Sequence, residues 1–273
     1  MTEPSMRYRS APERRRLVLE IIAGQGFCTF AELSQALKVS DMTVRRDVDQ
    51  LLAEGKVQRV RGGVTVLGPE VLNPSDFTAR AVEMGPAKVA IAHVALRFVS
   101  PGSSLCIDSG TTTLELARRL PEDAGLTVAT HSVAAINALM NRRGMQVHVM
   151  GGVLHPETQD FAGPSTVEAL KHLRFDTLFL AAGGVTGRGV YCASDHEALV
   201  KRALIEAAHR VVLLADSRKF SSSAMVRVCG LEALSHAVID DGITPEDAEL
   251  LRAAGVPLTV APAPESAASV EAM

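Results

Sequence analysis

The sequence predicts an α/β protein of two domains, a small winged helix-turn-helix domain and a larger Rossmann-like domain with a mostly parallel sheet. Within residues 13–68, three segments with helical spacing precede two short β-type runs. Beyond residue 87, Val/Leu-rich runs alternate with helical segments, which is typical of a parallel sheet covered on both faces. Residues 1–67 carry 11 Lys and Arg against 8 Asp and Glu, a net of +3, whereas the remainder carries 17 against 23, a net of −6. A small basic domain on a larger acidic one indicates that the basic part meets nucleic acid.

The overall composition excludes several other classes of protein. The chain of 273 residues is 47% hydrophobic, enough for a large core, but only 4% aromatic, which argues against a base-stacking platform. Its four cysteines are far apart and form no CxxC pair, so we predict neither a disulfide scaffold nor a metal site, and no cofactor. The N-terminus is polar and no apolar run could span a bilayer, so a soluble cytoplasmic protein with no membrane partner is expected.

The small domain contains three predicted helices. The first covers residues 14–24 and ends at two glycines. Thr29 caps the second, with Glu32 at capping-box spacing, and Ser40 caps the third, which ends at Gly55. The helix-turn-helix is therefore expected at about residues 30–49.

A glycine-containing turn at residues 61–63 lies between two β-type runs and predicts a hairpin, which completes a winged helix-turn-helix. The third helix would then enter the major groove of an operator in double-stranded DNA, with the hairpin as the wing. The predicted DNA-binding residues are Ser40, Asp41, Met42, Thr43, Arg45, Arg46, Arg59 and Arg61. The alternative is an exposed helix face with local ion pairs, but the element order and the basic charge favour DNA.

The rest of the chain divides into three parts. Residues 69–86 are predicted to be a linker, because Pro and Gly lie near both ends. Residues 87–260 form the α/β domain, and residues 261–273 are predicted to be a disordered tail. In parallel α/β folds, ligands bind at the carboxyl ends of strands.

The clearest candidate at such a strand end is the segment DSGTTT, residues 108–113. A strand ends at Asp108, a glycine loop follows, and a helix starts near Thr112. Loop N–H groups, three Thr hydroxyls and a helix N-terminus can cradle a phosphate. A plain strand-to-helix turn with Thr capping is an equally good account of this segment alone, which contains neither a Walker motif nor GxGxxG.

Three further segments follow predicted strands or open helices. They contain Gly152, Glu197 with Lys201, and Lys219. Taken singly, they also fit a simple turn, an exposed i,i+4 salt bridge and a solvent-exposed loop lysine. Their shared position at strand ends favours a pocket.

Residues 39–63, VSDMTVRRDVDQLLAEGKVQRVRGG, resemble the N-terminal signature of the DeoR family of bacterial transcriptional regulators, with Arg61 in place of a histidine. DSGTTT, the GG after a strand, Glu197–Arg202, D-S-x-K-F and a late I-D-D resemble the family's effector domain, so the similarity covers roughly residues 13–260. The resemblance implies a sensor fold similar to ribose-5-phosphate isomerase, and a phosphorylated sugar or related metabolite as effector. It places the phosphate at Ser109–Thr113 with Lys219 nearby.

Two positions depart from the family pattern: His131 stands where an asparagine is usual, and Arg218 where a serine is usual. His131 can still donate a hydrogen bond. The expected effector-binding residues are Asp108, Ser109, Gly110, Thr111, Thr112, Thr113, His131, Gly152, Glu197, Lys201 and Lys219.

The sequence thus predicts a sequence-specific DNA-binding regulator, a repressor released by a phosphorylated sugar or related metabolite, with no catalytic residue. One winged helix covers a single half-site, so a homo-oligomer, dimeric or higher, is expected. One alternative is a sugar-phosphate isomerase that uses Asp108, Asp195, Glu197, Lys201 and Lys219 for proton transfer, which leaves the basic domain unexplained. Another is a DNA-binding module with a purely structural dimerisation domain, which leaves DSGTTT without a role.

Overall fold

The computed structural model describes residues 11–25, 28–54, 56–60, 63–66, 77–222 and 224–262. The chain forms two compact units, residues 1–74 and 75–273. Arg61, residues 69–76 of the expected linker and residues 263–273 of the expected tail lie outside the described residues. Within the described ranges, no helix has the length and apolar character needed to cross a membrane.

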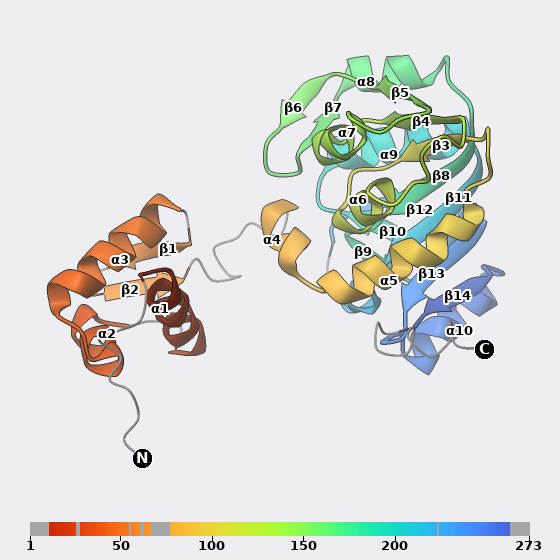
Figure 1. Cartoon of the computed structure of the whole chain (residues 1–273). Helices are drawn as coiled ribbons and strands as arrows, with labels where there is room; N and C mark the ends of the chain where they lie inside the picture. The colour runs from red at the N-terminus through yellow and green to blue at the C-terminus, as the bar shows by residue number, and fades with distance from the viewer. Residues whose placement is uncertain are drawn as a thin grey trace, which may run out of the picture. The chain divides into compact units, whose positions relative to one another are not determined.

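The first unit is a three-helix domain with a β-hairpin (Figure 1). Its elements are α1 (Ala11–Gln25), α2 (Phe30–Leu37), α3 (Asp41–Ala53) and the antiparallel strands β1 (Val57–Val60) and β2 (Gly63–Val66). The predicted capping box is present, since the Glu32 N–H donates to Thr29 Oγ1 at 3.2 Å and the Thr29 N–H donates to Glu32 Oε2 at 2.7 Å. Ser40 caps α3 by accepting from the Thr43 N–H. These local hydrogen bonds determine where both helices of the helix-turn-helix begin.

The core of this unit joins all of its elements. It is made of Val18, Ile22, Cys28, Leu33, Leu37, Val44, Val48, Leu51, Val57 and Val64. Cys28 also forms an antiparallel bridge with Val64, in which the two residues exchange N–H···O bonds of 2.9 and 2.8 Å. This bridge, which the sequence did not predict, fixes the hairpin to the segment that leads into α2.

The second unit is built on a parallel seven-stranded sheet in the order β14-β13-β11-β8-β3-β4-β5. The strands are β3 (Ser104–Ile107), β4 (Leu126–Thr130), β5 (Met145–Val149), β8 (Phe175–Ala181), β11 (Ala208–Ala215), β13 (His236–Asp240) and β14 (Leu258–Ala261). From β3 the chain moves through β4 to one edge, and then returns through β8 towards the other edge. The switch point therefore lies between β3 and β8, where the loops at the carboxyl ends diverge and leave room for a ligand.

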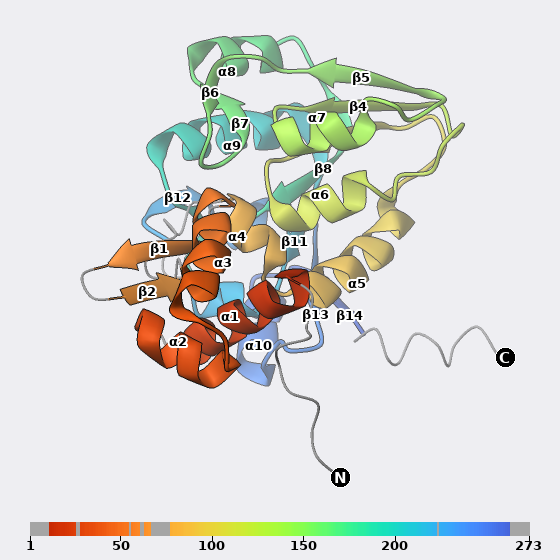
Figure 2. The same ribbon diagram turned by 60° about the vertical axis from the view of Figure 1, so that its left-hand side comes forward.

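Helices cover both faces of this sheet (Figures 1 and 2). One face packs against α5 (Gly85–Ala95), α6 (Thr111–Ala117) and α7 (Val133–Leu139), and the other against α8 (Pro164–Leu170), α9 (Asp195–Ala207) and α10 (Pro245–Ala253). Leu105 and Ile107 belong to the first core, whereas Cys106 between them belongs to the second. Burial on both faces explains why the strands are continuous apolar runs.

Several short elements were not predicted. They are the hairpin β6 (Val153–His155) and β7 (Asp160–Ala162), and the antiparallel sheet of β9 (Gly184–Thr186), β10 (Gly189–Cys192) and β12 (Val226–Cys229). The expected linker needs correction, because residues 77–86 contain α4 (Phe77–Val82) and the start of α5. Phe77 is buried, and its N–H donates to the Glu157 carbonyl at 2.7 Å, so α4 belongs to the second unit.

Candidate DNA-binding surface and effector site

The first turns of α3 expose the side chains that the sequence assigned to DNA. Met42 is 73% exposed, and Arg46 is exposed with no ion pair among the described residues. Arg45 donates to Asp41 Oδ2 at 2.9 Å, and its guanidinium lies 4.6 Å from the centroid of the Phe30 ring. Arg45 is thus held in a defined orientation by Asp41 and Phe30.

Asp47, the next residue, has a different role. It is 2% exposed and accepts two bonds from Arg14, 2.5 Å from Nε to Oδ2 and 3.1 Å from Nη2 to Oδ1. This bidentate pair ties α1 to α3, and such pairs are geometrically specific. The RRD motif therefore combines one structural carboxylate with two exposed arginines.

The wing residue Arg59 is exposed and bonds Asp49 on α3 at 2.5 Å. Its guanidinium also lies 5.7 Å from the Phe30 ring, on which Arg45 stacks. Exposed ion pairs contribute little to stability, so both arginines can exchange their carboxylate partners for phosphate. Arg61, the other wing candidate, is outside the described residues.

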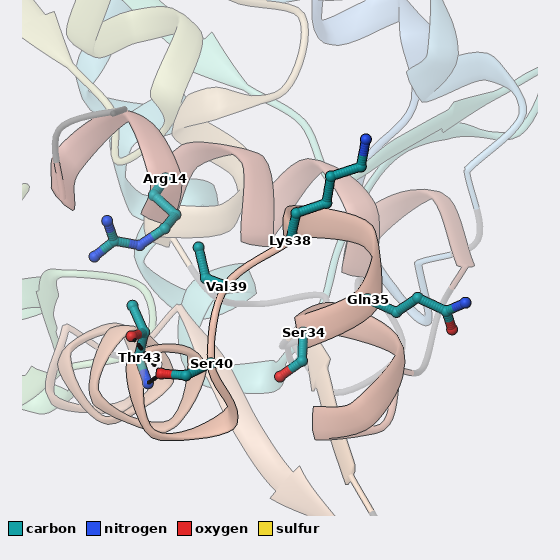
Figure 3. Close-up of a pocket in the computed structure, with 7 residues that line it drawn as sticks. All are labelled: Arg14, Ser34, Gln35, Lys38, Val39, Ser40 and Thr43. Carbon is teal, nitrogen blue, oxygen red and sulfur yellow. Dashed lines mark hydrogen bonds between the residues drawn. The ribbon is translucent and has the colours of Figure 1, made fainter. Parts of the chain in front are cut away.

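A polar groove runs along the turn between α2 and α3 (Figure 3). It is lined by Arg14, Ser34, Gln35, Lys38, Val39, Ser40 and Thr43. Ser34, Gln35 and Lys38, which also line this groove, were not among the predicted DNA-binding residues. Their position beside the tight turn was the available signal, because residues there approach the DNA backbone in a helix-turn-helix.

Asp108, at the end of β3, is fully buried and surrounded by donors. Its Oδ1 accepts from the Ser109 N–H at 2.9 Å, and its Oδ2 accepts from the Ala181 N–H at 2.8 Å and from Lys201 Nζ. Burial alone would raise the pKa of Asp108, but Lys201 and His131 lower it below the ordinary value. Protein groups thus occupy both oxygens, and Asp108 joins the ends of β3 and β8 to the middle of α9.

Lys201 forms the other half of this buried pair. Burial alone would lower the pKa of Lys201, but the charge of Asp108 raises it above its ordinary value. The alternative of an exposed pair between Glu197 and Lys201 is therefore wrong, because the lysine turns inward to a carboxylate 93 positions away in the sequence. His131 Nδ1 donates to the Phe161 carbonyl at 2.9 Å, and its Nε2 lies 3.2 Å from Asp108 Oδ1.

The three threonines of DSGTTT differ in their contacts. Thr113 Oγ1 lies 2.7 Å from the Asp108 carbonyl and 2.9 Å from the Gly110 carbonyl, so it holds the loop together. The hydroxyls of Thr111 and Thr112 make no hydrogen bond with any described residue and stay available to a ligand. A Cβ on Gly110 would lie 2.4 Å from Ala181 Cβ, so this position must be glycine for the loop to pack against β8.

The turn between β6 and β7 covers this loop. The Thr158 carbonyl accepts from Ser109 Oγ at 3.3 Å, and the Gln159 carbonyl accepts from the Val133 N–H at 2.8 Å. The neighbouring Glu157 carbonyl accepts the Phe77 N–H described above. No local pattern predicts this contact, because it joins residues about 50 positions apart.

Gly152 and Glu197 are placed differently from the DSGTTT loop. A Cβ on Gly152 would lie 2.2 Å from Thr166 Oγ1, so its contacts are with α8 and not with Asp108. Glu197 lies in the first turn of α9, where its N–H donates to Ser194 Oγ at 3.4 Å. Gly152 thus packs against α8, and Glu197 lies at the N-terminal end of α9.

A second charged cluster follows β11 and contains Lys88, Asp216, Arg218 and Lys219, with Glu83 at its rim. Burial lowers the pKa of Lys88 to about 8, against the opposing effect of Asp216, and burial also lowers the pKa of Lys219. Arg218 contacts both carboxylates, Glu83 Oε2 at 3.3 Å and Asp216 Oδ1 at 3.4 Å. Lys88 was not among the predicted site residues.

Comparison with known proteins identifies both units. Residues 14–70 match the DeoR-like helix-turn-helix domain, and residues 84–241 match the DeoR C-terminal sensor domain. The protein is a DNA-binding transcriptional regulator that carries its own sensor domain. More particularly, the chain belongs to the DeoR family, as the resemblance of its motifs predicted.

The similarity to relatives extends over most of the chain. The HTH-type transcriptional regulator YgbI of Escherichia coli K12 is 33% identical over 86% of this chain and 92% of its own length. The putative aga operon transcriptional repressor of Escherichia coli O157:H7 is 30% identical over 89% and 91%, and the glycerol-3-phosphate regulon repressor of Escherichia coli K12 is 29% identical over 85% and 92%. Among solved structures, ribose 5-phosphate isomerase A from Neisseria gonorrhoeae covers 50% of this chain and 53% of its own, at 16% identity and a TM-score of 0.36, too low to support an argument.

Proposed function

We propose that the protein is a repressor whose operator affinity is set by a phosphorylated sugar or related metabolite. The family membership supports regulation of transcription, and two relatives are named as repressors, of the aga operon and of the glycerol-3-phosphate regulon. The observation that carries the proposal is the polar loop at the β3–β8 switch point, where the hydroxyls of Thr111 and Thr112 make no hydrogen bond with a described residue. The protein acts on operator DNA in the cytoplasm, as a dimer or higher homo-oligomer that can span two half-sites.

On DNA, the exposed side chains at the start of α3 contact bases and the groove along the turn contacts phosphates. Met42, Arg45 and Arg46 are placed for base edges, and Lys38 and Arg59 for the backbone. Replacing Arg45 and Arg46 by alanine should lower operator affinity by about 1–3 kcal/mol for each arginine that reads a guanine. Lys38→Ala should weaken all sequences alike and reduce the salt dependence.

A fluorescence-anisotropy titration with operator DNA tests this assignment, and Arg143→Ala is its matched control. Arg143 is an exposed arginine in the second unit, with its side chain 83% accessible. The control should bind as the wild type does. Unchanged operator affinity in the Arg45→Ala, Arg46→Ala double variant would show that α3 is not the recognition helix.

In the sensor domain, the effector binds between the loop Ser109–Thr113 and the cluster with Lys219, which lies two strands away along the carboxyl edge. Adjacent strands are about 4.8 Å apart, so the two groups of residues are separated by roughly 10 Å, the length of a small sugar phosphate. Asp108, Lys201 and Thr113 position the loop and do not touch the ligand. A thermal-shift screen of sugar phosphates against the corresponding free sugars tests the site, because a ligand of the folded state must raise Tm.

The pocket binds its ligand and does not turn it over. Isomerisation requires a free base, and the carboxylate of Asp108 is already paired with Lys201. Assays with ribose 5-phosphate, glucosamine 6-phosphate and fructose phosphates should give no product above background. A robust rate that Glu197→Gln abolishes would favour the isomerase-like alternative.

A further inference from the structure

Helix α4 is fastened at both ends to the candidate effector site. At its N-terminal end, the Phe77 N–H binds the Glu157 carbonyl, in the turn whose Thr158 carbonyl contacts Ser109. At its C-terminal end, the Arg80 carbonyl accepts a hydrogen bond from Lys88 Nζ. Between these two ends, α4 packs against α6, the helix that follows the DSGTTT loop.

Lys88 has an unusual environment for a lysine. It is only 3% exposed, and within the part of the chain that the structure describes its single hydrogen-bond acceptor is the Arg80 carbonyl. An ammonium group has three donors, so two are left for a ligand. The burial that lowers the pKa of Lys88 makes the charged form costly unless an anion is near.

The charges around Lys88 do not balance. Among the described residues whose charges act on it, Lys219 and Arg218 add two positive charges to that of Lys88, against two negative charges on Glu83 and Asp216. Both carboxylates lie within 3.4 Å of Arg218, and neither lysine has a carboxylate in hydrogen-bonding contact among the described residues. An anionic phosphate would supply the missing negative charge.

Asp216 provides an independent indication of a ligand. It is fully buried, and its Oδ2 has no hydrogen-bond partner among the described residues. A buried acceptor left unpaired is costly, so a donor is expected there. A ligand with both a phosphate and a hydroxyl group would satisfy the lysines and Asp216 together, which is the chemistry of a sugar phosphate.

We propose that Lys88 is a further effector-binding residue, and that the effector's anionic group displaces the Arg80 carbonyl from Lys88 and so frees the C-terminal end of α4. This inference rests on the proposed sensing function and specifies its regulation. Residues 69–76 connect α4 directly to the DNA-binding unit, so the helix released by the effector is the one next to that connection. A ligand that binds better when α4 is released shifts the protein towards that state.

The test uses the full-length chain and inorganic phosphate, with phosphate affinity and amide hydrogen exchange of residues 77–84 as readouts. In the wild type, phosphate should accelerate exchange in this segment at least tenfold. Lys88→Met should weaken phosphate binding at least tenfold and show fast exchange even without phosphate. Lys219→Met should also weaken phosphate binding, but should leave phosphate-free exchange slow, because Lys219 does not bond Arg80.

Lys171→Met is the matched control, because Lys171 directly follows α8, has an exposed side chain and pairs with Glu168 at 2.6 Å. It should behave as the wild type. The inference is overturned if the wild type binds no phosphate, if phosphate leaves exchange at residues 77–84 unchanged, or if Lys88→Met binds phosphate normally. If a sugar phosphate shifts operator affinity equally in the wild type and Lys88→Met, only the inference fails; if no sugar phosphate shifts the wild type, the proposed function fails.

Discussion

Two lysines at the carboxyl edge of the same sheet are almost equally buried, yet their surroundings differ. Lys201 is 4% exposed and pairs with Asp108, whose charge raises its pKa. Lys88 is 3% exposed and bonds only a carbonyl among the described residues, and burial lowers its pKa to about 8. Burial alone therefore does not distinguish a charged residue that stabilises the fold, such as Lys201, from one that we assign to ligand binding, such as Lys88. The two differ in whether a protein carboxylate forms an ion pair with the lysine.

The small domain shows the same contrast between neighbouring residues. Asp47 is buried and held by Arg14, whereas Arg46 is exposed with no ion pair among the described residues. The first charge is part of the fold, and the second is available to DNA. In both domains, the residues that we assign to ligands are those without a protein counter-ion or those whose ion pairs are exposed.

The largest expected effect on stability comes from breaking the buried ion pair between Asp108 and Lys201. Lys201→Met leaves the carboxylate of Asp108 buried without its counter-ion, and such a loss costs about 3–5 kcal/mol of unfolding free energy. Urea denaturation at pH 7 measures it, with Lys171→Met expected within about 0.5 kcal/mol of the wild type. A loss below about 1 kcal/mol would show that the pair between Asp108 and Lys201 does not stabilise the fold as we propose.

The neighbours in the RRD motif should separate stability from DNA affinity. Asp47→Ala removes the acceptor of Arg14 between α1 and α3, so we expect a lower unfolding free energy, by about 1–3 kcal/mol. Arg46→Ala should leave stability within about 0.5 kcal/mol and weaken operator binding. Thermal unfolding and operator titration of both variants check this, and a destabilised Arg46→Ala would contradict the assignment.

The smallest effect is a pH-dependent change in stability at Lys88. Its pKa of about 8 lies below the ordinary 10.5, so the cost of burying the charge is fully present below pH 8 and is relieved as the pH rises towards 10.5. Lys88→Met should therefore stabilise the protein by about 1 kcal/mol at pH 7, with the gain fading towards pH 10. The charged groups that act on Lys88 are Asp216, Lys219, Arg218 and Glu83, and burial lowers the pKa of Lys219 as well.

Denaturation of wild type and Lys88→Met between pH 7 and 10 would measure this difference. A gain that stays constant over the whole range would mean that folding does not lower the pKa of Lys88. A loss at pH 7 would mean that its bond to the Arg80 carbonyl outweighs the cost of burial.

The sequence predicted the parts of the fold that depend on local patterns. The capping box at Thr29, the hairpin and the parallel sheet arise from neighbouring residues or from apolar runs. It could not show α4 or the three short strands β9, β10 and β12, because such short segments carry little periodicity. The partners of charged residues were also hidden, since the i,i+4 spacing suggested Glu197 for Lys201 and tertiary packing supplied Asp108 instead.

The central claim is that a phosphorylated metabolite at the carboxyl edge of the sensor sheet controls operator affinity. It is tested most directly by operator titration at one fixed salt concentration, with and without the sugar phosphate that gives the largest thermal shift. The proteins are the wild type and the Thr111→Val, Thr112→Val double variant, which removes the two hydroxyls that no described residue uses. We predict that the ligand lowers wild-type affinity by about 5–150-fold and leaves the variant unchanged. A ligand that binds the wild type without changing its operator affinity, or that shifts both proteins equally, would contradict the account.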